Sequence, residues 1–338
     1  MLESLEIENF RGIKKLKIDN FKNINFFIGK ANTSKTSLLE AILISLSQSP
    51  YSISLSLFFR GFIKDDDIFD SLFYDYDTTK EIYFNFFCNN KEFYINLKNN
   101  NENNEVVISF NDNNKIINNK LLFIKDKNYN NPPYLIFDNE NGIVRIYNSI
   151  NANIYYEFIT NENTSLYMAL TFNLKIILSD KNKSNIFKNM YKQFDDKIKD
   201  IKFIGKNIVV EFENLNHTVN IKSMGKGFQT YISIIASMVA GKKYIIIDEI
   251  ENGMHFESIK LLLENILALS KEYGLQFFIT THNKELLEIL NDCLIEKDYK
   301  DMLSVYNVYY NKENNIDVIN YSQENFSNLI ENNNEMRD

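Results

Sequence analysis

The spacing of hydrophobic residues changes from a period of two to a period of 3.6 near residue 35. Apolar and charged residues alternate over residues 5–10 and 16–18, which is typical of half-buried strands. Residues 24–28 form a short apolar run that ends at a glycine, as in a buried parallel strand. From residue 35 to 46 the apolar residues recur on one helical face. The N-terminal pattern therefore predicts strands followed by a helix.

The middle of the chain returns to strand patterns separated by asparagine-rich turns. This favours an antiparallel sheet, with strands expected at 81–87, 92–97, 106–110, 134–137 and 142–147. Residues 150–200 are expected to be helical with exposed lysines. A hairpin is expected from residues 208–212 and 218–221.

The last third of the chain alternates between helix and strand patterns. Helices are expected at 227–239, 257–273 and 284–290, and strands at 244–248, 276–280, 303–309 and 316–321. Such alternation predicts an α/β fold with a parallel sheet.

Composition narrows the classes of function. The chain has 338 residues, of which 44% are hydrophobic, so a disordered chain is excluded. The net charge is -8, which argues against binding to nucleic acid through global positive charge. The two cysteines, Cys88 and Cys293, form no CxxC pair and suit a reducing cytoplasm. The most apolar stretch, residues 41–59, is interrupted by serines and a proline and is a poor membrane span.

A loop with phosphate-binding character joins the strand at 24–28 to the following helix. It reads Gly29-Lys-Ala-Asn-Thr-Ser-Lys-Thr36, and it departs from the pattern GxxxxGK[ST] only where Ser34 replaces the second glycine. Loops of this type direct backbone N–H groups, a lysine and a hydroxyl at phosphate and magnesium. A chance loop is the alternative. The residues expected to bind ATP and Mg²⁺ are Gly29, Asn32, Thr33, Ser34, Lys35, Thr36 and Ser37.

Two carboxylates follow the apolar strand at 244–248. Asp248, at the strand end, is expected to lie beside the loop and to hold magnesium. Glu249 is placed to act as the general base on the attacking water. The alternative is a solvated acidic turn, because Glu251 follows closely.

The strand at 276–280 also ends in polar residues, Thr280, Thr281 and His282. His282 is one of three histidines and would reach the same sheet edge. Its position favours a sensor of the γ-phosphate, and a surface histidine at a helix start is the alternative.

Taken together, the motifs resemble those of the ABC-type ATPases of the SMC/RecF/OLD branch. More closely, the chain resembles compact AAA family ATPases without coiled coils, many of which are linked to phage defence. The matching segments are Phe10-Arg-Gly-Ile13, the loop at 29–36, residues 247–255, residues 280–282 and the ending Glu335-Met-Arg337. The resemblance implies an ATPase head with a parallel core sheet, an antiparallel β subdomain and an inserted helical lobe.

In that family ATP lies between two heads, and a Ser-x-Gly signature at a helix start completes the neighbour's site. The matching stretch here is 222–229, with Ser223 and Gly225. An ordinary glycine turn that caps a helix is the alternative. The resemblance therefore implies a homodimer closed around ATP and magnesium. It also places Arg11 near the nucleotide, against the alternative of a surface residue of a strand.

Some features depart from the family or stay ambiguous. Besides Ser34, no glutamine stands at a convincing Q-loop position, since Gln48 lies on the helix of the phosphate loop. Lysines between residues 175 and 192, interleaved with Phe187 and Tyr191, are compatible with a local nucleic-acid face or with a solvated helix face.

The expected organisation is an ATPase head interrupted by two insertions. Residues 1–75 and 206–338 would form the head, residues 76–149 the β subdomain and residues 150–205 the helical lobe. The expected function is an ATP-hydrolysing dimerisation switch in anti-phage defence or DNA surveillance, with a separately encoded effector. A nucleotide-gated scaffold with little hydrolysis and a RecF-like DNA-repair ATPase remain alternatives.

Overall fold

The computed structural model describes most of the chain. The described residues are 1–47, 52, 53, 56, 70–100, 105–112, 115–123, 135–139, 142–145, 156–159, 163–297, 299 and 301–331.

Within this part of the chain, the central element is a six-stranded sheet with the order β10-β14-β15-β3-β16-β17. Neighbouring strands are parallel, except that β17 runs antiparallel to β16. The strands are β3 (Ile24–Ile28), β10 (Tyr156–Ile159), β14 (Tyr244–Ile247), β15 (Gln276–Thr280), β16 (Leu303–Tyr310) and β17 (Ile316–Tyr321). The carboxyl ends of β3, β14 and β15 therefore meet at one sheet edge, where ligands of such sheets bind.

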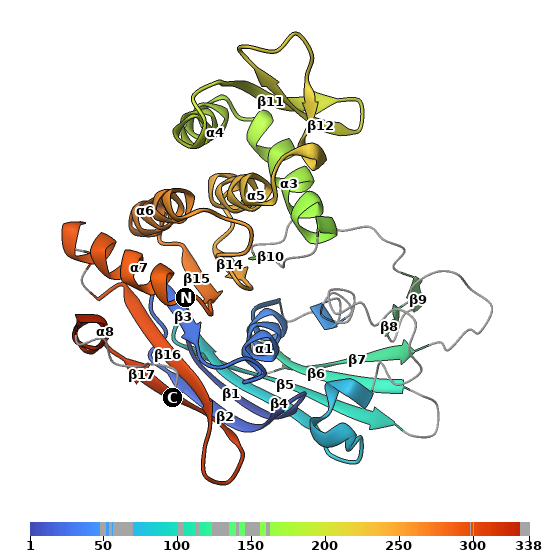
Figure 1. Cartoon of the computed structure of the whole chain (residues 1–338). Helices are drawn as coiled ribbons and strands as arrows, with labels where there is room; N and C mark the ends of the chain where they lie inside the picture. The colour runs from blue at the N-terminus through green and yellow to red at the C-terminus, as the bar shows by residue number, and fades with distance from the viewer. Residues whose placement is uncertain are drawn as a thin grey trace.

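A second sheet is antiparallel and has eight strands among the described residues, in the order β2-β1-β4-β5-β6-β7-β8-β9. Its strands are β1 (Leu2–Phe10), β2 (Ile13–Asp19), β4 (Ile82–Cys88), β5 (Lys91–Asn100), β6 (Glu105–Asp112), β7 (Lys115–Phe123), β8 (Leu135–Asn139) and β9 (Gly142–Arg145). The first two strands of the chain and the strands expected in the β subdomain thus belong to one continuous sheet (Figure 1).

Helix α1 (Lys35–Ser47) lies between the two sheets (Figure 1). Its residues 37–45 are buried all round the helix, not only on the expected apolar face. One hydrophobic core joins α1 to both sheets and includes Leu39, Phe27 and Phe84. The buried position of α1 fixes the loop that precedes it.

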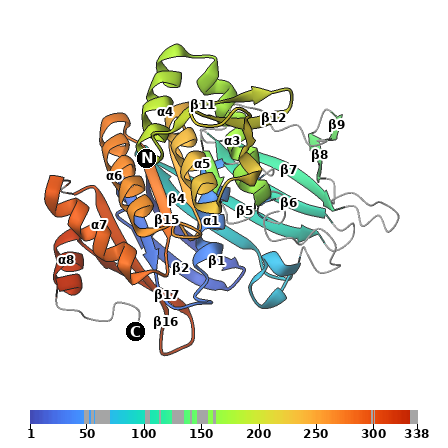
Figure 2. The ribbon, with the colours of Figure 1, turned by 45° about the horizontal axis from the view of Figure 1, so that its top comes forward.

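Three helices cover the opposite face of the central sheet: α5 (Lys226–Ala240), α6 (Phe256–Tyr273) and α7 (Lys284–Lys297). Figure 2 shows them side by side over its strands. They pack on it through a second hydrophobic core. Helix α8 (Gln323–Glu331) follows β17.

Residues 163–220 form a lobe of two helices and a small sheet. The helices are α3 (Asn163–Leu178) and α4 (Lys181–Phe194), and the strands are β11 (Ile198–Ile204), β12 (Asn207–Phe212) and β13 (Val219–Asn220). Asp180 caps α4 by accepting the N–H groups of Asn182 and Lys183. This lobe leads directly into α5 (Figure 1).

The structure confirms the α/β class and most expected elements, and it corrects several. Strand β7 was not among the expected strands. Segment 150–200, expected to be helical, contains the edge strand β10 and the start of β11. The helix expected at 284–290 continues to Lys297. Phe187 and Tyr191 are each 2% exposed and pack into the core, so the lysines of α4 have no aromatic residues interleaved at the surface. Gln48 and the ending 335–337 lie outside the described residues.

Among the helices that the structure describes, none combines the length and the apolar character needed to span a membrane.

Candidate active site

The loop between β3 and α1 is forced into a tight path by three backbone conformations. Gly29 has a φ of 140°, and a Cβ at this position would lie 2.2 Å from the carbonyl oxygen of Val308. Only glycine fits there. Asn32 and Ser34 have φ values of 63° and 59°, in the left-handed region. The loop therefore curls above the end of β3, beside β16.

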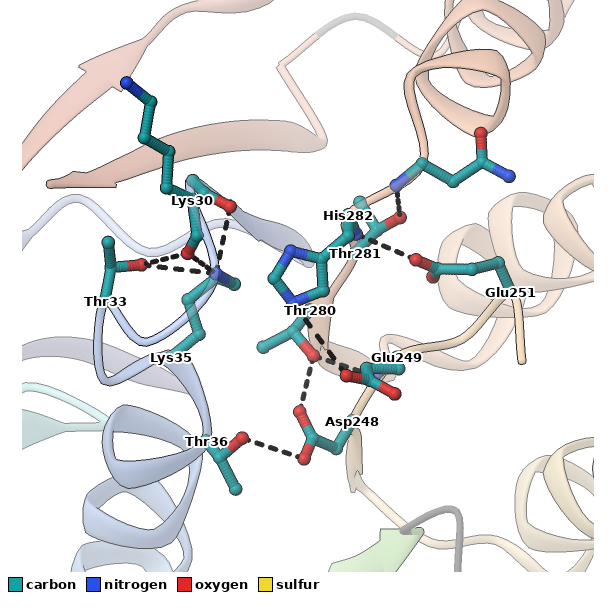
Figure 3. A network of polar contacts seen from close by, with 12 residues as sticks. Lys30, Thr33, Lys35, Thr36, Asp248, Glu249, Glu251, Thr280, Thr281 and His282 are labelled. Atoms are coloured by element: carbon teal, nitrogen blue, oxygen red, sulfur yellow. Dashed lines mark hydrogen bonds and ion pairs between the residues drawn. The ribbon is translucent and has the colours of Figure 1, made fainter. Parts of the chain in front are cut away.

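Lys35 begins α1 and is folded back onto this loop (Figure 3). Its Nζ donates to the carbonyl oxygens of Lys30 at 2.6 Å and Gly29 at 3.0 Å, and to Oγ1 of Thr33 at 3.2 Å. Burial lowers the pKa of Lys35 from 10.5 to about 8, although Asp248 and nearby glutamates partly oppose the shift. The ammonium group thus fills the centre of the loop, where an anion would replace the carbonyl oxygens.

Asp248 follows β14 and is fixed by two hydroxyl groups. Thr36 donates to its Oδ2 at 3.0 Å, and Thr280 donates to its Oδ1 at 2.6 Å. Thr280 also accepts the backbone N–H of Glu249 at 2.8 Å. These contacts join the ends of β14 and β15 to the first turn of α1 (Figure 3).

Glu249 and His282 face each other across the same edge (Figure 3). Oε1 of Glu249 lies 3.8 Å from Nε2 of His282, and the two side chains are 42% and 37% exposed. The φ of Glu249 is 51°, a left-handed conformation held by the hydrogen bond to Thr280. Oε1 of Glu251 accepts the backbone N–H of His282 at 2.8 Å.

The donor set at this edge suits magnesium. Thr36 supplies a hydroxyl and Asp248 a carboxylate, and the two are within hydrogen-bond distance. Mg²⁺ is usually held by one or two carboxylates together with phosphate oxygens and water. Among the described side chains, no group of three or more His, Cys, Asp or Glu residues forms a dedicated metal cage. The residues therefore fit an ion that arrives with a phosphate.

The signature residues lie at the start of α5 and are exposed. Ser223 ends the short helix η3 (Ile221–Ser223), and Gly225 precedes α5 as its N-cap. Among the residues that the structure describes, no hydrogen bond joins either residue to the phosphate loop.

The start of α5 contacts the loop that follows Glu249. A Cβ on Gly227 would lie 2.4 Å from the carbonyl oxygen of Gly253, and Gly253 has a φ of 76°. Both glycines are required where the two main chains touch.

The remaining residues from the sequence are placed as follows. Thr33 is buried and donates its hydroxyl to the carbonyl oxygen of Lys30 at 2.9 Å. Ser37 is buried in the first turn of α1, whereas Asn32 is exposed. His255 is exposed and precedes α6.

Arg11 is 7% exposed, which excludes the alternative of a surface residue. Its Nε lies 2.7 Å from Oε2 of Glu40 in α1, and its Nη2 donates to Ser56 at 3.1 Å. The guanidinium thus ties the β1–β2 turn to α1, and a contact with nucleotide stays a prediction.

Two residues of the site were assigned no role from the sequence. Thr280 donates a hydrogen bond to Asp248, and Glu251 accepts one from the backbone N–H of His282. Thr280 was detectable in principle, since a polar residue at the end of a buried strand points to the ligand edge. The sequence offered no comparable signal for Glu251.

Comparison with known proteins gives results of three kinds. Residues 24–288 match the family described as "AAA domain, putative AbiEii toxin, Type IV TA system". An ATP/GTP phosphatase of Helicobacter pylori is 26% identical, with 90% of this chain and 92% of the relative covered. A DNA replication and repair protein RecF of Lactobacillus acidophilus is 49% identical over 49 residues, which are 14% of this chain and 13% of the relative.

Among solved structures, the chain is similar to an SMC head bound to the C-winged helix domain of ScpA. The TM-score is 0.55 at 13% identity, and the match covers 95% of this chain and 97% of that chain. This similarity shows a shared fold.

Proposed function

The chain belongs to the family described as "AAA domain, putative AbiEii toxin, Type IV TA system", and on that premise we propose that two copies close around ATP as a switch driven by hydrolysis. The chain is an ATPase head with the ABC-type fold of SMC proteins. The observation that supports the proposal most strongly is the gathering of Lys35, Thr36, Asp248, Glu249 and His282 at one sheet edge.

Lys35 is the group that binds the β- and γ-phosphates in this proposal. Its three present acceptors are uncharged oxygens, so a phosphate oxygen is a stronger partner for the ammonium group. The loop N–H groups and the start of α1 add partial positive charge at the same place.

Thr36 and Asp248 would hold magnesium, which supplies charge neutralisation on the phosphates when bound. Thr280 keeps the Asp248 carboxylate in position by donating to it. Asp248 is thereby oriented before any ligand arrives.

Glu249 is the proposed general base. Its carboxylate is partly exposed at the sheet edge, and its backbone is fixed by Thr280, so the side chain can take a proton from a water molecule there. His282 faces Glu249 and would contact the γ-phosphate, so that it distinguishes ATP from ADP.

The proposed dimer accounts for the exposed signature residues. Ser223 and Gly225 are at the start of a 15-residue helix and have no hydrogen bond to the phosphate loop of their own chain within the described residues. In a second copy they would complete the neighbour's site, with the N-terminus of α5 directed at phosphate. The arrangement is reciprocal in a two-fold dimer.

We assign the switch to anti-phage defence with a separately encoded effector protein. The family description names a putative toxin of a toxin–antitoxin system, and such a system has a second component, which is compatible with a separately encoded partner. The net charge of -8 and the buried aromatic residues of α4 give no support to a broad DNA-binding surface.

The test is a steady-state ATPase assay together with size-exclusion chromatography. Glu249→Gln should bind ATP but not hydrolyse it, because an amide cannot take the proton, and it should elute as a dimer with ATP and magnesium. Lys35→Ala should abolish ATP binding and serves as the matched control that cannot dimerise. Monomeric Glu249→Gln with ATP would contradict the closed dimer.

The same assay distinguishes the two alternatives. A wild-type protein that dimerises with ATP but shows no turnover is a nucleotide-gated scaffold. Strong stimulation of turnover by duplex DNA would indicate a RecF-like repair ATPase, which the local identity of 49% over 49 residues favours.

A further inference from the structure

The turn between β1 and β2 lies directly against the phosphate loop. A Cβ placed on Gly12, in this turn, would be 2.4 Å from Oγ of Ser34 and 3.6 Å from its Cβ. Among the described residues no other heavy atom outside the neighbouring residues lies within 4 Å of that position. Gly12 is otherwise exposed. A side chain at residue 12 would therefore meet Ser34 and solvent.

The backbone at Gly12 does not itself require glycine. Gly12 has no φ in the left-handed region, in contrast to Gly29. An L-amino acid can adopt its conformation without strain. Among the described residues, the Ser34 hydroxyl is thus the group that opposes a side chain at residue 12.

Both main chains at this contact are anchored. On one side, the N–H of Arg11 donates to the carbonyl oxygen of Leu72 at 2.8 Å, and the Arg11 guanidinium pairs with Glu40. On the other side, the carbonyl oxygen of Ser34 accepts the N–H of Leu38 at 2.9 Å in the first turn of α1. Neither chain can withdraw without breaking such contacts.

We propose that Gly12 is a positioning residue for the phosphate loop: its lack of a side chain leaves the space that the Ser34 hydroxyl needs in its present rotamer. The proposal rests on the proposed binding of ATP by this loop. Residues 12 and 34 are then a matched pair. Ser34 stands where the phosphate-loop pattern has its second glycine, and it is tolerated there because Gly12 opposite has no side chain. A methyl group at residue 12 forces the hydroxyl into another rotamer or displaces the loop.

Four proteins test the proposal: wild type, Gly12→Ala, Ser34→Ala and the double variant. Ser34→Ala keeps a Cβ but lacks Oγ, so it leaves this space free. ATP affinity is measured with a fluorescent ATP analogue, and the midpoint of thermal unfolding is measured without nucleotide. We expect Gly12→Ala to weaken ATP binding at least fivefold when residue 34 is serine and less than twofold when residue 34 is alanine.

An equal loss in both backgrounds, or no loss in either, would overturn the proposal. If Gly12→Ala alone does not fold, recovery of folding by the double variant supports the pair, and failure of both contradicts it. The thermal midpoint separates this proposal from the proposed function. A wild type that binds no ATP would refute both the nucleotide site and the positioning role. If Gly12→Ala then lowers the thermal midpoint more with serine than with alanine at residue 34, the contact has a structural role only.

Discussion

Oε1 of Glu251 accepts the backbone N–H of His282 at 2.8 Å, so a loop after one strand supports the histidine after the next. The other carboxylate oxygen, Oε2, is buried and makes no hydrogen bond within the part of the chain that the structure describes. The side chain of His282 is thereby held 3.8 Å from Glu249. In the proposed mechanism, Glu251 would act on the reaction through His282 rather than by touching the phosphate.

Replacing Glu251 should therefore slow turnover without weakening ATP binding. We expect Glu251→Ala to lower kcat about tenfold or more, within the range for a misplaced catalytic group, and to leave the dissociation constant of ATP nearly unchanged. Glu251→Gln should retain most activity, because an amide oxygen still accepts the N–H. Equal losses in both variants would show that the charge matters and the hydrogen bond does not. A double variant with His282→Ala should be no worse than His282→Ala alone.

ATP affinity should fall as the pH rises above 8. In the nucleotide-free protein the pKa of Lys35 is about 8, because burial disfavours its charge. Phosphate favours the charged form and raises this pKa, so binding takes up a proton between the two values. The affinity should then fall by up to roughly tenfold per pH unit between pH 8 and pH 10.

Calorimetry at pH 8.5 in two buffers of different ionisation enthalpy measures the proton directly. We expect a measurable uptake of protons on ATP binding, because part of Lys35 is neutral at that pH. Adenosine, which has no phosphate, should cause none. A constant affinity up to pH 10 would contradict the assignment of Lys35 as the phosphate ligand.

Ser223→Arg should abolish turnover while leaving ATP binding to a single chain intact, because an added side chain at this exposed position blocks the surface offered to the neighbour. Lys35→Ala should also be inactive. An equal mixture of the two should recover part of the wild-type activity, because a mixed pair has at most one complete site, made by the phosphate loop of Ser223→Arg and the signature of Lys35→Ala. Ser179→Arg, at another exposed serine, is the control. Full activity of Ser223→Arg alone would show that no chain completes another's site.

Ser34→Gly should tighten ATP binding several-fold, accelerate hydrolysis, or do both. The φ of Ser34 is 59°, and a left-handed conformation costs a non-glycine residue roughly 1–2 kcal/mol. Glycine removes this strain. Ser34→Ala keeps the strain and lacks the hydroxyl, so it separates the two effects. If Ser34→Gly weakens binding and slows turnover, the hydroxyl is a ligand of the phosphate.

Glu40→Ala should reduce the free energy of unfolding by about 3–5 kcal/mol, because it leaves the Arg11 charge without its carboxylate in a buried place. The side chains of Arg11 and Glu40 are 5% and 1% exposed. Urea unfolding measures the change. Glu8→Ala is the matched control, because it removes one of the two carboxylates that pair with the exposed Lys15, at 2.6 Å, and should cost at most about 1 kcal/mol. Similar costs for both variants would show that the buried pair contributes no more than a surface pair.

The sequence was sufficient for features that depend on local pattern. The phosphate loop, the apolar strand before Asp248 and the strand before Thr280 are contiguous segments, and the ends of parallel strands meet at one edge wherever such strands pair. This logic predicted that Lys35, Asp248 and His282 would lie together before any coordinate was known.

Features that depend on pairing across long separations were not predictable in the same way. Edge strand β10 has only four residues, and its partner β14 is far along the chain, so its own pattern was too short to outweigh the helical segments around it. Arg11 and Glu40 are both charged, and nothing in the local pattern shows that they bury each other. The contact of Gly12 with Ser34 likewise appears only when the β1–β2 turn is placed against the loop.

The contact between Gly227 and Gly253 has a consequence for the proposed pair. The carbonyl group of Gly253 lies directly against Gly227, so we expect a shift of the segment that carries Glu249 to displace the start of α5. In the proposed pair, hydrolysis in one copy would thus shift the start of α5 that this copy presents to the nucleotide site of the other copy. We therefore expect the two sites of the proposed pair to hydrolyse ATP in a coupled way rather than independently.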